Sequence, residues 1–301
     1  MMLTGVHFLL TYRCNIGCDH CFLYCGPRAA GTFTLAQIER VLQELLELGT
    51  VETVCFEGGE PFLHPRLLLA GVRRAHALGF RVGIVTNASW ATSDESAKRR
   101  LRPLVAAGLG NLTVSDDALH FGEISPTPAK RAMAAAGRLG MPYSAICIER
   151  PTVVRPSREA SGEKGEPVVG GGVMFRGRAA DLLAEGLPRR AWEAFAECPH
   201  ENLRAPKRVH LDPFGHVHLC QGLLMGNMWE TPFAELVRAY DAETHPIAGP
   251  LVRGGPTELA RTYGVAQGGA YVDACHLCYT ARRALLDRFP RHLAPRQVYG
   301  Y

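Results

Sequence analysis

Three cysteines lie close together near the start of the chain, in the segment TYRCNIGCDHCF (residues 11–22). Thiolates are soft ligands that bind iron and zinc. Cys14, Cys18 and Cys21 have CxxxCxxC spacing, and the motif contains no fourth cysteine at a matching interval. This pattern favours a [4Fe-4S] cluster with three cysteine ligands and one open iron. An open iron is a position at which a small molecule can bind and react.

A structural zinc ion is the alternative for this segment. Structural zinc usually has four closed ligands, and its cysteines usually come in CxxC pairs. The CxxxCxxC spacing fits that pattern poorly, although Cys25 follows Cys21 closely enough to be a fourth ligand. Zinc therefore stays open as the second interpretation, and Cys25 is otherwise a neighbour of the site.

A second motif, Gly58-Gly59-Glu60-Pro61, follows the next strand-like segment of the chain. The cysteines come after an apolar stretch at residues 6–10, and the GGEP turn comes after β-branched and aromatic residues at 51–56. Glycines let a backbone turn tightly and approach a ligand closely. A cysteine triplet followed by GGEP, one helix and one strand later, resembles the signature of the radical S-adenosylmethionine (SAM) superfamily.

The resemblance implies a cofactor site and a chemistry. In that superfamily the open iron binds the amino and carboxylate groups of SAM, and an electron from the cluster cleaves SAM to a 5′-deoxyadenosyl radical that abstracts hydrogen from a substrate. The backbone of the turn at residues 58–61 is implied to bind the methionine amino group. The residue before the third cysteine is usually aromatic and lies near the adenine; here His20 has that position, and Phe22 follows the cysteine. An electron donor such as flavodoxin or ferredoxin is also implied.

Polar residues after later strands complete the predicted cofactor site. Asn87 and Ser115 each follow a predicted strand, and Arg178 lies in a Gly-Arg-Ala segment that resembles one in the superfamily. The resemblance makes Arg178 a candidate for holding the methionine carboxylate. Each residue has a plainer alternative, because Asn and Ser are common in turns and arginine is common on surfaces. Three neighbours of Ser115 are weaker candidates on the same grounds: Asp116, Asp117 and His120.

Four further cysteines form a separate set in the C-terminal part of the chain: Cys198, Cys220, Cys275 and Cys278. A hairpin predicted around residues 213–215 precedes Cys220, and this arrangement resembles the opening of SPASM and twitch extensions. Because no cysteine follows Cys278, the twitch form fits better, and it implies one auxiliary [4Fe-4S] cluster without an open iron. A closed zinc site is the alternative, because four thiolates that include a CxxC pair suit tetrahedral zinc.

Five histidines lie near this second set in the sequence: His200, His210, His216, His218 and His276. They are interpreted as residues that tune hydrogen bonds to sulfur rather than as ligands. Alternation places His216 and His218 on one face of a strand, and solvent exposure of that face is the plain interpretation. Two cysteines outside both sets, Cys55 and Cys147, fall within predicted strands and are interpreted as small buried apolar side chains.

The elements that position these residues alternate between strand and helix. Strands are predicted at residues 6–10, 51–56, 81–86, 112–115 and 143–148, and helices follow a capping box at 34–37 and at 66–78, 94–107 and 128–139. An irregular excursion at 150–167 then precedes a sixth strand at 168–175. The sequence therefore predicts an α/β fold, a partial (β/α)6 barrel of the TIM type with a C-terminal auxiliary-cluster extension. The candidate residues follow the carboxyl ends of strands, so we expect them on one face.

Composition limits the class of protein. The 301 residues are 47% hydrophobic and 21% charged, which is typical of a globular protein, and we expect a barrel at 1–190 and an auxiliary iron–sulfur domain at 191–301. The net charge of +4 is small and scattered, so nucleic-acid binding is not indicated. The only apolar stretch near the start is too short to span a membrane and lacks the basic flank of a secretion signal, which favours a cytoplasmic location without a membrane partner.

The predicted function is that of a radical SAM enzyme that oxidises or otherwise modifies a peptide or a small molecule, and the sequence does not identify a catalytic acid or base. A non-catalytic iron–sulfur or zinc protein, with a structural or redox-sensing role, is the alternative. The intact GGEP turn argues against that alternative.

Overall fold

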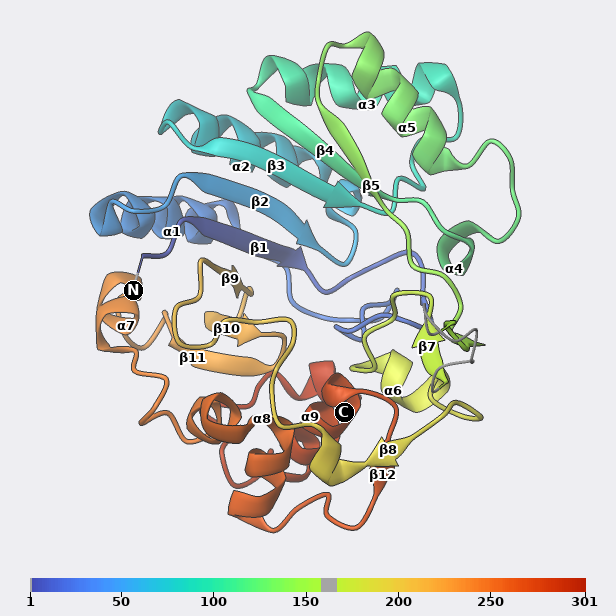
Figure 1. The fold of residues 1–301 in the computed structure, drawn as a ribbon. Coiled ribbons are helices and arrows are strands. Elements are labelled where there is room, and N and C mark those ends of the chain that lie inside the picture. Colours follow the sequence, from blue (N-terminus) through green and yellow to red (C-terminus); the bar gives the residue numbers. More distant parts are fainter. Residues whose placement is uncertain (1, 158–166) are drawn as a thin grey trace.

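The computed structural model describes residues 2–157 and 167–301. Five parallel strands lie side by side in chain order: β1 (Gly5–Thr11), β2 (Thr53–Gly58), β3 (Arg81–Thr86), β4 (Leu109–Ser115) and β5 (Tyr143–Ile146). They are joined by helices α1 (Leu35–Leu48), α2 (Pro65–Ala77), α3 (Asp94–Ala106) and α5 (Pro128–Arg138), which pack side by side against the sheet (Figure 1). The predicted α/β class is confirmed, with the five predicted strands and the four helices between them.

The sixth parallel strand is not the predicted one. Residues 168–175 contribute only β7 (Val168–Gly170), which pairs antiparallel with β6 (Thr152–Val154) in a separate two-stranded ribbon. The strand stops there because Gly171 and Gly172 both have positive φ and turn the chain. The sixth parallel strand is β9 (Arg208–Leu211), which pairs with the edge of β1 that faces away from β2. Most of the excursion predicted at 150–167 lies outside the described residues.

The C-terminal part of the chain is built onto the same sheet. Strand β10 (His216–Cys220) forms the predicted hairpin with β9, and β11 (Leu223–Asn227) pairs with β10. One eight-stranded sheet therefore contains strands from both sides of residue 190, the predicted domain boundary. Below it in Figure 1 lie α8 (Ala248–Tyr263) and α9 (Ala274–Ala284). The remaining elements are α4 (Ala118–Phe121), α6 (Arg178–Leu182), β8 (Arg190–Ala191), α7 (Phe233–Ala239), β12 (Ala270–Tyr271) and the short 3-10 turns Pro61–Leu63, Trp192–Ala194 and Arg296–Tyr299.

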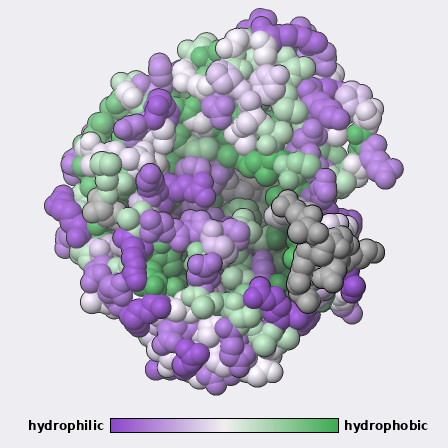
Figure 2. Space-filling view, in the orientation of Figure 1, coloured by the Kyte–Doolittle hydropathy of each residue, from purple (hydrophilic) through white to green (hydrophobic). Residues whose placement is uncertain are grey.

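The two faces of the sheet differ in chemistry. Phe8 and Phe56 point toward the helices and are fully buried, with their rings stacked 5.2 Å apart. The alternating positions His7 and Glu57 point the other way and line a cavity instead. Figure 2 shows a hollow near the middle of this view of the molecule. Apolar burial therefore holds the helices onto the sheet, while a polar inner face is left for a ligand.

Cys55 and Cys147 are not the buried apolar side chains predicted for them. Cys55 is half-buried, because it lies on β2 at an alternating position with Glu57. Cys147 is exposed, because it follows β5, the last strand in the order of the sheet, whose four residues are all exposed. Neither thiol belongs to the two cysteine sets.

Helix α1 begins at the predicted capping box and ends at Gly49, as expected. The Thr34 hydroxyl accepts a hydrogen bond from the backbone N–H of Gln37 at 3.2 Å, and the Gln37 side chain accepts one from the backbone N–H of Thr34 at 2.8 Å. Gly49 adopts the left-handed conformation, with φ of 72°. These contacts satisfy polar groups at the helix ends that would otherwise lack partners.

Removal of the Thr34 hydroxyl tests the contribution of this cap. Thr34→Ala is expected to lower the free energy of unfolding by about 1 kcal/mol, because a donor at the start of α1 loses its acceptor. Thr34→Ser keeps the hydroxyl and is the matched control. Denaturant unfolding followed by circular dichroism measures the difference, and equal stability of the alanine variant and the wild type would contradict the assignment.

Candidate functional site

The first cysteine set lies at the mouth of the cavity on the inner face of the sheet. The cavity has a volume of about 480 Å³, within the range of small-molecule sites. Ten of the residues predicted for the cofactor site line it: Cys14, Cys18, His20, Cys21, Gly58, Gly59, Asn87, Ser115, Asp117 and His120. The loop after β1, the turn after β2 and the ends of β3 and β4 thus converge on one space, as strand-end loops of parallel sheets do.

Asn87 connects the end of β3 to the cysteine loop. Its side-chain amide nitrogen lies 3.6 Å from Cys14 Sγ and donates a hydrogen bond to Asn15 Oδ1 at 3.0 Å. Asn15 in turn donates to the Ser89 hydroxyl at 2.9 Å. An N–H group directed at a sulfur suits a thiolate ligand, because hydrogen bonds to sulfur stabilise its negative charge. The position of Asn87 therefore fits a cluster on Cys14.

Gly58 and Gly59 serve a purpose that the sequence analysis did not predict. A Cβ atom at Gly59 would lie 2.1 Å from the carbonyl oxygen of Arg13, and one at Gly58 would lie 2.6 Å from that of Thr11. Gly58 also has φ of 120°, which side chains rarely adopt. Both glycines allow the turn after β2 to pack against the backbone that leads into the cysteine loop, in addition to lining the cavity.

Glu60 and Pro61 do not line the cavity. The Glu60 carboxylate is 1% exposed and accepts hydrogen bonds from the backbone of Phe62 and Asn87 at 3.0 and 2.8 Å and from the Thr86 hydroxyl at 2.8 Å. Burial raises the pKa of Glu60 to about 7, although these three donors favour the ionised form. The side chain joins the turn to the end of β3, and Pro61 begins the buried 3-10 turn that follows.

Arg178 holds the cysteine loop from the opposite side. Its guanidinium donates to the carbonyl oxygens of Cys18, at 2.8 Å, and of Cys25. The adjacent Gly177 has φ of 58°, and a Cβ there would lie 2.5 Å from the Cα of Phe22. The Gly-Arg-Ala segment is therefore packed directly on the loop. The predicted contact between Arg178 and the methionine carboxylate stays a prediction.

His20 belongs to a cluster with two residues that follow β4. The rings of His20 and His120 meet edge to face at 4.9 Å, and His120 Nδ1 lies 2.8 Å from Asp117 Oδ1. Asp117 also caps α4 and accepts a hydrogen bond from the backbone N–H of Ile148 at 3.3 Å. Asp116 accepts a hydrogen bond from Thr127 at 2.6 Å. Asp117 therefore has the local role that was its plainer interpretation, whereas Asp116 binds Thr127, the residue that caps α5.

The second cysteine set also meets at one place. All four of its cysteines line a small cavity together with two buried arginines: Cys198, Cys220, Cys275, Cys278, Arg176 and Arg282. Arg176 Nη1 lies 2.9 Å from Cys220 Sγ, and its guanidinium lies over the Phe22 ring at 5.1 Å. Arg176 lines the large cavity as well. Two buried cations beside four thiols favour a group that brings negative charge to this cavity.

The spacing of the sulfurs bears on which group would fit. Within the described parts of the chain, no three cysteine sulfurs lie within 4.8 Å of one another. Tetrahedral zinc with bonds of about 2.3 Å requires sulfurs about 3.8 Å apart. A cubane holds its cysteine sulfurs farther apart, because each sulfur binds a different iron. The cysteine sulfurs are thus not gathered as closely as a single zinc ion requires.

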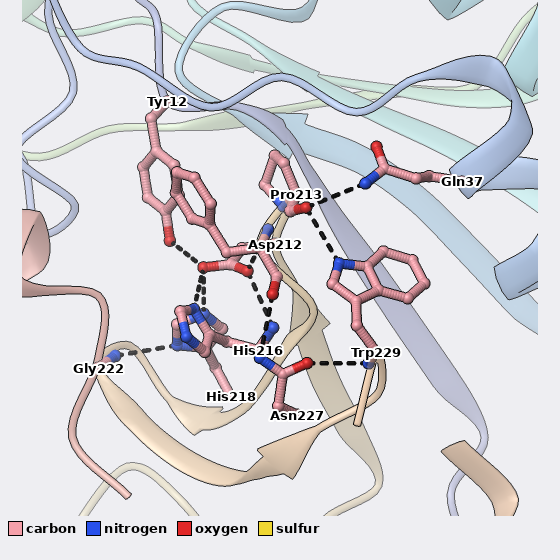
Figure 3. Close-up of polar contacts among 10 residues, drawn as sticks. Tyr12, Gln37, Asp212, Pro213, His216, His218, Gly222, Asn227 and Trp229 are labelled. Carbon is pink, nitrogen blue, oxygen red and sulfur yellow. Dashed lines mark hydrogen bonds and ion pairs between the residues drawn. The ribbon is translucent and has the colours of Figure 1, made fainter. Parts of the chain in front are cut away.

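His216 and His218 are not solvent-exposed, which corrects the plain interpretation of their strand face. Both rings contact the buried Asp212 carboxylate, His216 Nδ1 at 2.8 Å and His218 Nε2 at 3.2 Å from Oδ2 (Figure 3). The Tyr12 hydroxyl donates to the same oxygen at 2.9 Å. His218 Nδ1 accepts a hydrogen bond from the backbone N–H of Gly222 at 3.1 Å. This network, which sequence reasoning missed, joins the start of the cysteine loop to the hairpin that carries Cys220.

Comparison with known proteins identifies the family to which this architecture belongs. The family model described as "Radical SAM superfamily" matches residues 8–149, which include the cysteine loop, the GGEP turn and the ends of β3 and β4. Residues 8–149 belong to the radical SAM superfamily. Membership implies a [4Fe-4S] cluster and SAM, and Cys14, Cys18 and Cys21 are the residues here that fit such a cluster.

Curated relatives of this radical SAM protein have diverse activities. The chain is 30% identical over 115 residues to an S-adenosylmethionine-dependent nucleotide dehydratase of Selenomonas ruminantium and 41% identical over 58 residues to the antilisterial bacteriocin subtilosin biosynthesis protein AlbA of Bacillus subtilis (strain 168). It is 24% identical over 111 residues to the putative peptide biosynthesis protein YydG of the same organism. These matches cover 38%, 19% and 37% of the chain and 39%, 13% and 35% of the relatives.

Among the helices of the described residues, none has the length and hydrophobicity that crossing a membrane requires.

Replacement of Asp212 tests the network around it. Asp212→Asn is expected to lower the free energy of unfolding by about 1–3 kcal/mol, because an amide nitrogen replaces an oxygen that three side chains approach. Burial would raise the pKa of Asp212, but His216 and His218 outweigh burial and lower it. The carboxylate therefore stabilises the fold above its unfolded pKa of about 3.9 and loses that effect as the pH falls below it.

Denaturant unfolding at pH 7 and pH 3.5 measures both effects. The difference in stability between the wild type and Asp212→Asn should shrink at the lower pH. The matched control is Asp241→Asn, since Asp241 is exposed and also caps a local turn. A difference that is unchanged with pH, or that the control reproduces, would count against the network.

Proposed function

We propose that this protein is an enzyme that cleaves SAM reductively and uses the resulting radical to take a hydrogen atom from a substrate. The observation that carries the proposal is the convergence of Cys14, Cys18 and Cys21 with Gly58 and Gly59, the first half of the GGEP turn, on one cavity. When bound, the cluster and SAM together supply a 5′-deoxyadenosyl radical. The remaining chemistry belongs to the chain, which holds the cofactors, positions the substrate and excludes water.

We assign three tasks to residues at the cavity. The three cysteines hold the cluster, and the hydrogen bond from Asn87 toward Cys14 Sγ supports this. The backbone of the turn at residues 58–61 binds the methionine amino group. His20, Asn87 and Ser115 contact the rest of the cofactor, and Arg178 keeps the loop in place through the carbonyl of Cys18. We also assign the methionine carboxylate to Arg178 as a second contact.

We propose a second [4Fe-4S] cluster on Cys198, Cys220, Cys275 and Cys278, within an auxiliary region at residues 191–301 that follows a barrel at 1–190. The convergence of the four thiols with the buried Arg176 and Arg282 on one cavity supports a group that carries negative charge there. Four cysteine ligands leave no open iron, so its role is electron transfer. Arg176 supports that role, because it lines both cavities and contacts Cys220 on one side and Phe22, next to Cys21, on the other.

The substrate is a peptide or a small molecule, and the relatives include proteins of both kinds. In a two-electron oxidation the auxiliary cluster would accept the electron that remains after hydrogen abstraction. The first cluster needs a low-potential donor such as flavodoxin or ferredoxin. We place the protein in the cytoplasm, because that compartment keeps cysteine thiols reduced.

Formation of 5′-deoxyadenosine tests the proposed activity. The protein reconstituted anaerobically with iron and sulfide should release 5′-deoxyadenosine when dithionite and SAM are added, and Cys14→Ala should abolish release, because the cluster loses a ligand. Chromatography with mass detection measures the product. Cys147→Ala is the control, since this exposed thiol belongs to neither set. If the wild type releases no more product than Cys14→Ala, the protein is a non-catalytic metalloprotein.

Metal analysis tests the second cluster. Two cubanes predict about eight iron atoms per chain, and Cys278→Ala should reduce iron by about four without loss of the first cluster. Iron and zinc are measured together by plasma mass spectrometry, and sulfide is measured by colorimetry. About four iron atoms with one zinc per chain would instead assign the C-terminal cysteines to a structural zinc site.

A further inference from the structure

A histidine–glutamate–histidine group lies on the inner face of the sheet, apart from both cysteine sets. His7 comes from β1, Glu57 from β2 and His210 from β9, three strands that are adjacent in the sheet. His7 and His210 are direct partners in the register of β1 and β9. All three side chains line the large cavity and are at most 23% exposed.

The nitrogen and oxygen atoms of this group converge. His7 Nδ1 lies 3.3 Å from Glu57 Oε2, and His210 Nε2 lies 3.1 Å from Glu57 Oε1. One ligand atom from each of the three residues lies within 4.8 Å of the other two. Around an ion with bonds of about 2.1 Å, neighbouring ligand atoms lie about 3.0 to 3.4 Å apart. The observed separations match that range.

Hydrogen bonding accounts for only part of the arrangement. Despite its distance to Glu57, the buried His7 Nδ1 has no partner with hydrogen-bond geometry, and the same is true of the buried His210 Nδ1. Within the described residues, no backbone N–H or hydroxyl donates to the Glu57 carboxylate. A buried carboxylate normally has such donors, and a buried imidazole nitrogen normally has a partner. The group thus has unused capacity to bind a ligand.

Two other histidine–carboxylate groups provide a contrast. Asp212 accepts hydrogen bonds from Tyr12 and from the backbone of Phe214 and His216, so both of its oxygens are used. Asp117 likewise accepts hydrogen bonds from the backbone N–H of His120, where it caps α4, and from the backbone N–H of Ile148. Glu57 differs because, among the residues that the structure describes, the two imidazoles are the only ion-pair or hydrogen-bond partners of its carboxylate.

We propose that His7, Glu57 and His210 form a binding site for one divalent transition-metal ion within the cavity. Two imidazoles and one carboxylate are the ligand set of sites that bind zinc or ferrous iron and leave coordination positions open. Because the three residues line the cavity, the open positions face the space available to a substrate. An anionic or chelating group of the substrate would bind there.

Manganese titration of the full-length protein tests this site without SAM cleavage. The protein is reconstituted with its clusters, freed of loosely held iron by a chelator and titrated anaerobically with Mn²⁺, while the EPR signal of free Mn²⁺ is recorded. We expect one equivalent to bind and to be displaced by Zn²⁺. His7→Gln and His210→Gln should each weaken binding at least about tenfold, because one ligand is lost. His120→Gln is the matched control, as it removes a cavity-lining histidine from the group of Asp117.

Pulsed EPR of the wild type gives a reading that does not depend on variants. Nitrogen modulation from imidazole on the bound Mn²⁺ is expected. The proposal is overturned if the wild type binds no Mn²⁺, if the bound ion shows no imidazole nitrogen, or if His120→Gln abolishes binding while His7→Gln and His210→Gln retain it. Iron content and circular dichroism equal to those of the wild type show that each variant is folded.

Discussion

The close contact between the start of the cysteine loop and the GGEP turn is the constraint on which the rest of the site depends. Gly59 donates its backbone N–H to Thr11 at 2.6 Å, and Glu60 donates to Arg13 at 2.9 Å. Any side chain at Gly58 or Gly59 would occupy the space of that backbone. These hydrogen bonds continue past the β1–β2 ladder and hold the two strands together at their carboxyl ends. Parallel sheets bind their ligands at that edge.

Other contacts hold the same loop from further directions. Asn87 reaches it from the end of β3, and Arg178 reaches it from the start of α6. Tyr12 connects it through Asp212 to the hairpin of β9 and β10. A loop that must hold three sulfurs in a set geometry gains rigidity from each of these bonds. The contacts come from both parts of the chain, so the barrel and the C-terminal region share one structural support.

The inner face of the sheet explains how such a fold accommodates chemistry. A packed apolar interior would be more stable, yet β1, β2 and β9 place His7, Glu57 and His210 around the cavity. Polar groups buried without full hydrogen bonding reduce stability, and their persistence at one place indicates a functional constraint. The helices on the other face, with Phe8 and Phe56 buried beneath them, provide compensating apolar burial.

The local pattern of the sequence predicted most of the first half of the molecule. Hydrophobic periodicity predicted the five strands and the four helices between them, and the capping box predicted the start of α1. The positions of the strand ends predicted which residues line the cavity. These features depend on neighbours in the chain, and the sequence contains that information directly. The strand predicted at 168–175 was wrong because its apolar residues suited a strand while two glycines ended it.

The sequence by itself determined the chemistry: which cysteines form each set, and that the triplet and the GGEP turn follow adjacent strands. Only the tertiary structure decided that β9 joins β1, that Tyr12 meets Asp212, and that His7 and His210 meet at Glu57. The pairing of β9 with β1 and the hydrogen bond from Tyr12 to Asp212 join residues about 200 positions apart in the chain. Their partners are chosen by the packing of whole elements rather than by local propensity, so no local pattern records them.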